Sequence, residues 1–164
     1  MPDGRLLVIY LNDHLAGAAL GTELTKRSLR SNSGTALGTF LEGFLAEVEE
    51  DRRSLERVMD ALGVKKSPFK RPAAVVAERL GRLKLNGQVR GYSPLSRVLE
   101  LEGLSMGVEA KLSLWQNLRD VPEVSAQLRG VDLDALIERA ERQRSSLERE
   151  RLSAARRAFA ASGS

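Results

Sequence analysis

Apolar residues recur at helical spacing along most of the chain. The pattern is clearest between Leu37 and Leu62, where the positions of one seam follow each other at intervals of four and three residues. Those intervals place the side chains on one side of an α-helix, where they can pack against a neighbour. Ser93 and Pro94 open another such segment and are a favoured N-cap and first-turn pair. The pattern predicts long helices at about residues 6–29, 35–62, 93–118 and 133–160, and a shorter helix at about residues 72–83.

The connections between these segments predict how the helices are arranged. The short loop SNSG, residues 31–34, and a break around Pro122 and Gly130 each join two helices that would run antiparallel. The connection at residues 64–92 is long enough to cross the end of a bundle, and it carries the extra short helix. We therefore predict a single all-α domain over residues 1–164, a four-helix bundle of two helix hairpins with a long crossover. Apolar residues make up 42% and aromatic residues only 4%, which is typical of helices packed on helices.

Two pairs of charged residues interrupt the apolar faces of the last two long helices. Glu102 and Glu109 lie seven residues apart, and a helical wheel places both inside the apolar arc of the 93–118 helix. Arg144 and Arg151 have the same separation on the 133–160 helix. A carboxylate within an apolar stripe is costly unless it is paired, protonated or bound to a metal. The matching intervals predict a buried ion network of Glu102, Glu109, Arg144 and Arg151 that specifies how the helices pair. The alternative to burial is that the wheel misplaces these four side chains and they are exposed.

A metal site is the alternative interpretation of the inward-facing acidic residues. Asp51 is the one polar member of its seam, and Glu47 lies one turn before it. Asp13 and His14 fall on the buried side of the first helix. Carboxylates from several helices together with an imidazole suit iron or manganese. The candidate metal ligands are Asp13, His14, Glu47, Asp51, Glu102 and Glu109.

The segment FLEGFLAEVEEDRRSLERVMDALGV, residues 40–64, and the two helix pairs with inward acidic residues resemble the ferritin-like superfamily. Through residues 40–64 the chain also resembles the small bacterial ferritin-like proteins of unknown function. The resemblance implies a two-iron pattern with a glutamate on the first and third helices and Glu-x-x-His on the second and fourth. In that pattern Glu102 or Glu109 takes the third-helix position, and Asp13 or Glu23 takes the first.

The second and fourth helices depart from the pattern of that family. They carry Glu49-x-x-Arg52 and Glu141-x-x-Arg144, with arginine where the family has histidine. An arginine stays protonated and cannot ligate a metal. The resemblance therefore implies a ferritin-like bundle that lacks an intact two-iron centre and needs no cofactor, and a structural or interaction protein rather than an enzyme. A ferritin-like protein that binds iron or manganese through non-standard ligands remains the alternative.

Two further features bear on partners. The first helix is apolar over most of its circumference, which predicts burial against a second subunit and hence a homodimer. The net charge is +4, but 26 basic residues are interleaved with 22 acidic ones, which favours a salt-bridged surface over a nucleic-acid footprint. A DNA-associated bundle is a third hypothesis. It would use the last helix's arginines and the basic residues Lys65, Lys66, Lys70, Arg71, Lys84 and Arg90.

The composition excludes several other classes of site. The sequence contains no cysteine, so disulfides, thiolate metal sites and cysteine nucleophiles are excluded. No apolar run approaches the roughly 18 residues that a membrane-spanning helix requires. The first residues do not have the pattern of a signal peptide, because Asp13 and His14 interrupt a short apolar run. We therefore expect a cytoplasmic protein without a membrane span.

Overall fold

The computed structural model describes residues 4–67 and 91–160, and these residues fold into helices and short connections without a strand. The helices are α1 (Gly4–Ser31), α2 (Ala36–Ala61), α4 (Pro94–Asp120), α5 (Pro122–Ser125) and α6 (Leu133–Ala160). The all-α prediction is confirmed, and each long helix begins and ends within two residues of its predicted bounds. The short α5 occupies the break near Pro122. The helix predicted at about residues 72–83 lies outside the described residues.

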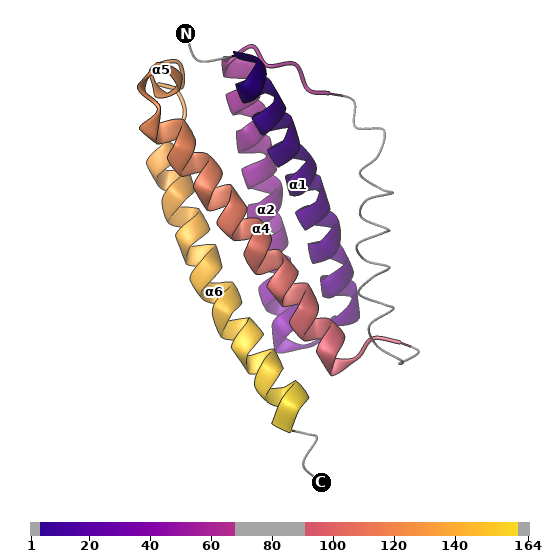
Figure 1. The fold of residues 1–164 in the computed structure, drawn as a ribbon. Coiled ribbons are helices and arrows are strands. Elements are labelled where there is room, and N and C mark those ends of the chain that lie inside the picture. Colours follow the sequence, from indigo (N-terminus) through magenta and orange to yellow (C-terminus); the bar gives the residue numbers. More distant parts are fainter. Residues whose placement is uncertain (1–3, 68–90, 161–164) are drawn as a thin grey trace.

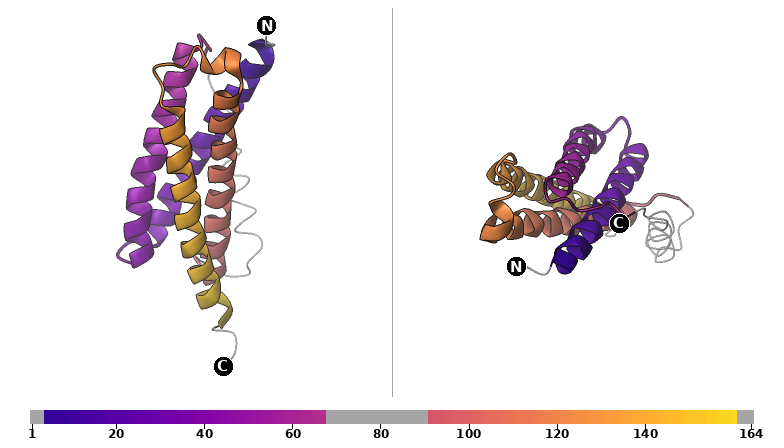
Figure 2. Two further views of the ribbon diagram at one scale, coloured as in Figure 1. Left: turned by 90° about the vertical axis from the view of Figure 1, so that its left-hand side faces the viewer. Right: turned by 90° about the horizontal axis from the view of Figure 1, so that it is seen from above.

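The long helices form two antiparallel hairpins that lie side by side (Figures 1 and 2). One hairpin is α1–α2 and the other is α4–α6. Between the hairpins, α1 lies against α4, while α2 faces α6 with little close backbone contact. The end of α2 and the start of α4 lie at opposite ends of the bundle (Figure 1), so α2 and α4 run in the same direction. A long connection between the hairpins is therefore required, as the sequence predicts.

Local signals in the sequence set the starts of two helices. Thr35 is the N-cap of α2, and its hydroxyl accepts a hydrogen bond of 3.1 Å from the amide of Gly38. Ser93 and Ser96 form a reciprocal capping box at the start of α4. A glycine is needed at position 38 because a Cβ there would lie 2.3 Å from the carbonyl oxygen of Asn32. The turn between α1 and α2 can close tightly only if this residue has no side chain.

The apolar core consists of two clusters, one toward each end of the bundle. The cluster at the α5 end is built around Trp115, Leu55 and Leu136. The cluster at the other end is built around Leu41, Leu104 and Leu147. Polar side chains lie between the two clusters, at the middle of α2, α4 and α6. No helix in residues 4–67 and 91–160 has the combination of length and hydropathy required to cross a bilayer.

Candidate functional site

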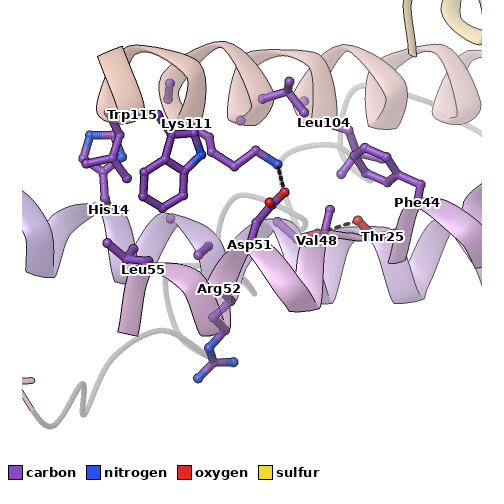
Figure 3. A pocket seen from close by; sticks show the side chains of 18 residues that line it. His14, Thr25, Phe44, Val48, Asp51, Arg52, Leu55, Leu104, Lys111 and Trp115 are labelled. Atoms are coloured by element: carbon purple, nitrogen blue, oxygen red, sulfur yellow. Dashed lines mark hydrogen bonds and ion pairs between the residues drawn. The ribbon is translucent and has the colours of Figure 1, made fainter. Parts of the chain in front are cut away.

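The polar side chains at mid-bundle are organised around one buried carboxylate. Asp51 lies on the α2 seam between Val48 and Leu55 and is almost completely buried. Its Oδ2 is 2.5 Å from the Nζ of Lys111 on α4. Figure 3 marks this contact with a dashed line. Its Oδ1 is 2.6 Å from Nη2 of Arg139 on α6 and accepts a hydrogen bond of 2.7 Å from Nε of the same guanidinium. One carboxylate from the first hairpin is thus neutralised by two cations from the second.

Gln143 completes this cluster, which we call the ionic layer: Asp51, Lys111, Arg139 and Gln143. Its buried amide nitrogen donates 3.0 Å to Asp51 Oδ2 and 2.9 Å to Glu47 Oε2. Its amide oxygen accepts a hydrogen bond from the Lys111 ammonium. Because an amide both donates and accepts, Gln143 can join the carboxylates to the lysine without adding charge. Glu47 is exposed at the rim, so the layer reaches solvent on the side between α2 and α6.

The electrostatics of the layer are set mainly by burial. Burial lowers the pKa of the Lys111 ammonium below its ordinary value of 10.5, and the nearby Asp51 carboxylate partly offsets this by raising it. Arg139 also lowers the Lys111 pKa, because two cations share the same acid. Removing the carboxylate would leave both cations in an environment of low dielectric, where an unpaired charge is expensive. Asp51 is therefore the residue on which the layer depends.

The sequence predictions include Asp51, and Glu47 at the rim of the layer, but not Lys111, Arg139 or Gln143. Two of these three residues share a signal with Asp51 in the sequence. Asp51 interrupts an apolar seam of four-and-three spacing, and Lys111 does the same on α4 between Val108 and Trp115. Gln143 interrupts the equivalent seam on α6 between Ala140 and Leu147. A polar residue at a seam position on each of three helices indicates a shared polar layer. Arg139 lies beside the α6 seam and has no such signal.

The predicted network of Glu102, Glu109, Arg144 and Arg151 forms pairs but is not buried. Arg144 Nη1 lies 3.3 Å from Glu109 Oε2, and Arg151 Nη1 lies 4.0 Å from Glu102 Oε1. The side chains of Glu109 and Glu102 are 58% and 46% exposed. The predicted burial was wrong. On a helical wheel the apolar residues Leu95, Leu99 and Met106 extend the arc of α4 past both glutamates, which placed these two side chains inside it. Leu95 and Met106 are in fact exposed, so the arc extended onto the solvent side of the helix.

The six candidate metal ligands are not brought together. Asp13 is exposed on α1, whereas His14 is half-buried and packs edge-on against the Tyr10 ring with centroids 4.5 Å apart. Burial lowers the pKa of His14 below 6.5, although Asp13 raises it in part. Glu47 and Asp51 meet through Gln143, while Glu102 and Glu109 lie on the α4–α6 surface. Within residues 4–67 and 91–160, no cluster of three or more acidic, histidine or cysteine side chains is placed to hold a metal ion.

A second buried carboxylate, which the sequence did not single out, lies at the end of the bundle away from α5. Glu100 of α4 is buried, and its Oε2 accepts a hydrogen bond of 3.0 Å from the Tyr92 hydroxyl. Its Oε1 is 3.1 Å from Nε of Arg27 on α1, close enough for an ion pair but not aligned as a hydrogen bond. Burial raises the pKa of Glu100 above 4.5, and the Tyr92 hydrogen bond and Arg27 oppose the rise. The wheel gave no signal here because α1, a different helix, covers this edge of α4.

Only Lys65 and Lys66 of the middle-connection residues in the DNA hypothesis lie within the described residues. Lys66 is 3.4 Å from Asp60 Oδ1 and 4.0 Å from Glu56 Oε2, so acidic neighbours partly neutralise it. Lys65 is exposed. The other members of the set in the middle connection, Lys70, Arg71, Lys84 and Arg90, lie outside the described residues. DNA binding therefore stays a prediction.

Comparison of the chain with known protein families, with curated proteins and with solved structures found no match. The resemblance to the ferritin-like superfamily accordingly stays a prediction from the sequence.

Proposed function

We propose that this chain is a non-catalytic helical scaffold that acts by association, and that its core acid is neutralised by its own side chains rather than by a metal. The observation that carries this proposal is the environment of Asp51. Both of its carboxylate oxygens are already in contact with cations, Lys111 and Arg139. A metal ion at this position would have to displace both cations, at the cost of leaving two positive charges next to it.

The arrangement of the helices is compatible with a ferritin-like bundle. Two antiparallel hairpins joined by one long connection between opposite ends of the bundle are typical of that superfamily. The positions of the family's Glu-x-x-His motifs support a metal-free scaffold. Arg52 and Arg144, which stand at the histidine positions, are exposed, and so is Glu141. These side chains lie on the outside of the bundle, where they cannot form an interior metal centre.

We propose that the partner is a second copy of the chain, bound through the N-terminal half of α1. Leu6 and Ile9 lie on the outer side of this helix and are 64% and 49% exposed. If two α1 helices pair antiparallel about a two-fold axis through Ile9, Arg5 of one copy lies opposite Asp13 of the other. The same contact repeats across the axis, as an isologous interface requires. An apolar centre with complementary charges on both sides therefore favours self-association.

Light scattering coupled to size-exclusion chromatography tests this association. We expect the wild-type chain to have twice the mass of one chain, and Ile9→Glu to have the mass of a single chain. Leu152→Glu is the matched control, because Leu152 is also an exposed apolar residue of a long helix but lies on α6. Arg5→Glu and Asp13→Arg should each weaken the dimer, and the double variant should restore it. A wild-type monomer at all concentrations, or no effect of Ile9→Glu, would overturn the proposed dimer.

Elemental analysis tests the metal-free part separately. The protein purified from cells grown with iron and manganese should contain far less than one equivalent of either metal. A stoichiometric metal that is retained in the wild type and lost in Asp51→Asn would overturn this part of the proposal. The proposed association would not be affected, because light scattering tests it separately.

A further inference from the structure

The last turns of α6 carry two rows of exposed side chains that differ in character. Leu152 and Phe159 form an apolar row and are 39% and 64% exposed. Arg149 and Arg156 form a basic row and are also exposed. Each arginine precedes an apolar residue by three positions, so the two rows lie side by side, about 60° apart around the helix. One outward side of this helix end is therefore both apolar and basic.

Leu95, at the start of α4, adds a third exposed apolar side chain to the same end of the bundle, and it is 40% exposed. The helices α4 and α6 run antiparallel, and Glu102 lies 4.0 Å from Arg151. Leu95, seven residues before Glu102, therefore comes opposite residue 158, next to Phe159. The last turns of α6 project beyond the turn between α1 and α2 (Figures 1 and 2), so this end can approach a flat surface.

Acidic neighbours do not neutralise the positive charge of this end. Within residues 4–67 and 91–160, Arg156 and Arg157 have no hydrogen-bond or ion-pair partner. Glu148, which lies beside the apolar row, is itself paired with Arg151 at 2.7 Å. No acidic residue follows Glu150 in α6. The α6-end patch, as we call it, consists of Leu95, Arg149, Leu152, Arg156, Arg157 and Phe159.

A surface of anionic lipid matches both kinds of side chain in the α6-end patch. Leucine and phenylalanine can enter the boundary between headgroups and acyl chains, while the long arginine side chains keep their charges at the phosphates. The phosphates of DNA would also attract the arginines. They would leave Leu152 and Phe159 in water, however, so the apolar row favours lipid over nucleic acid.

We propose that the α6-end patch docks the protein on the surface of a bilayer rich in anionic lipids, without crossing it. Arg149, Arg156 and Arg157 supply the attraction to the headgroups, and the apolar side chains hold the protein at the boundary. The proposal is independent of the proposed association, because Leu6 and Ile9 lie on α1 at the opposite end of the bundle (Figure 1).

Sedimentation with lipid vesicles tests the proposal. The protein should bind vesicles of equal parts phosphatidylglycerol and phosphatidylcholine far more tightly than vesicles of phosphatidylcholine alone, and added salt should weaken the binding. Arg156→Gln combined with Arg157→Gln should weaken it about thirtyfold, since each basic residue near an anionic surface contributes about fivefold to the binding constant. Arg129→Gln combined with Arg142→Gln is the matched control. It removes the same charge from two exposed arginines outside the patch and should leave binding within about twofold of wild type.

The apolar row has its own variant. Phe159→Ser should weaken vesicle binding about tenfold, the loss expected when a large apolar side chain is no longer buried. Met106→Ser is its control, because Met106 is 70% exposed but lies outside the patch. Phe159→Ser should also keep the wild-type mass in light scattering, so a failure of docking and a failure of the proposed dimer can be told apart.

Three outcomes would overturn the docking proposal. The first is no binding of the wild type to the anionic vesicles at low ionic strength. The second is that the control variants weaken binding as much as the patch variants. The third is that a DNA duplex binds more tightly than the vesicles and Phe159→Ser leaves the DNA affinity unchanged, which would assign the arginines to nucleic acid.

Discussion

Removing the Asp51 carboxylate tests the central feature of this bundle. Asp51→Ala leaves Lys111 and Arg139, both largely buried, without the acid that contacts them at 2.5 and 2.6 Å. Breaking a buried ion pair by deleting one partner costs about 3–5 kcal/mol, because the other charge is left uncompensated. For a chain of this length each kcal/mol corresponds to roughly 2–4 °C in melting temperature. We therefore expect the melting temperature of Asp51→Ala to fall by roughly 6–20 °C.

Urea unfolding at pH 7, followed by circular dichroism, measures this loss of stability. Glu109→Ala is the control, because it removes an acid from the exposed pair with Arg144 and should change the free energy of unfolding by no more than about 0.5 kcal/mol. A double-mutant cycle adds Lys111→Ala. The double variant should lose less unfolding free energy than the sum of the losses in the two single variants, since removing the lysine also removes the positive charge that Asp51→Ala leaves unpaired.

The pH dependence gives a signature that a packing defect would not produce. Without Asp51, the Lys111 pKa should fall further below 10.5, because its main favourable neighbour is gone. A base whose folded pKa is lowered binds fewer protons in the folded state, so stability rises as the pH rises through that pKa. The gap in unfolding free energy between wild type and Asp51→Ala should therefore narrow as the pH rises from the lower folded pKa of Lys111 in the variant to its folded pKa in the wild type, both below 10.5. The reasoning is refuted if Asp51→Ala costs no more than Glu109→Ala, or if the gap does not change with pH.

Two further predictions concern the end of the bundle away from α5. Glu100 has a folded pKa raised above 4.5, so the wild type should lose stability relative to Glu100→Gln as the pH rises from 4.5 toward that folded pKa. Unfolding both proteins over a series of acidic pH values measures this loss, and a difference in unfolding free energy that stays constant with pH would contradict it. Gly38→Ala should destabilise by about 1–3 kcal/mol in urea, because its Cβ would clash with the Asn32 carbonyl. Gly43→Ala on the same helix should instead stabilise by about 0.5–1 kcal/mol, and equal effects would contradict the clash.

The sequence predicts the helices well because the signals for them are local. Four-and-three spacing and the caps at Thr35 and Ser93 depend only on residues within one helix. The alignment of α4 with α6 also follows from the sequence to a useful degree, since Glu109 does pair with Arg144. Burial of that pair was not predictable from one helical wheel. The wheel gives the direction of a side chain but not whether another helix covers it.

The buried polar residues differ in where they lie relative to the apolar seams of their helices. Asp51 and Gln143 are both buried at seam positions, so a polar residue within a regular seam is a better indicator of a buried polar group than a polar residue at its edge. Glu100 is the opposite case. It lies off the main α4 seam and is buried by α1, so only the tertiary arrangement reveals it.

The position of the ionic layer explains why a charge is kept in the middle of an otherwise apolar core. Asp51 belongs to the first hairpin, whereas Lys111, Arg139 and Gln143 all belong to the second. Leucine seams tolerate a shift of one helical turn, about 5.4 Å, because one leucine replaces another. A shift of the second hairpin by one turn in either direction would take Lys111 away from Asp51, because the residues four positions from Lys111 are Gly107 and Trp115, which carry no charge. Since α2 and α6 make little close backbone contact, the layer supplies the charged contacts that favour one alignment of these two helices, while α1 packs directly on α4. Such alignment is the best-attested role of buried polar groups in helical bundles.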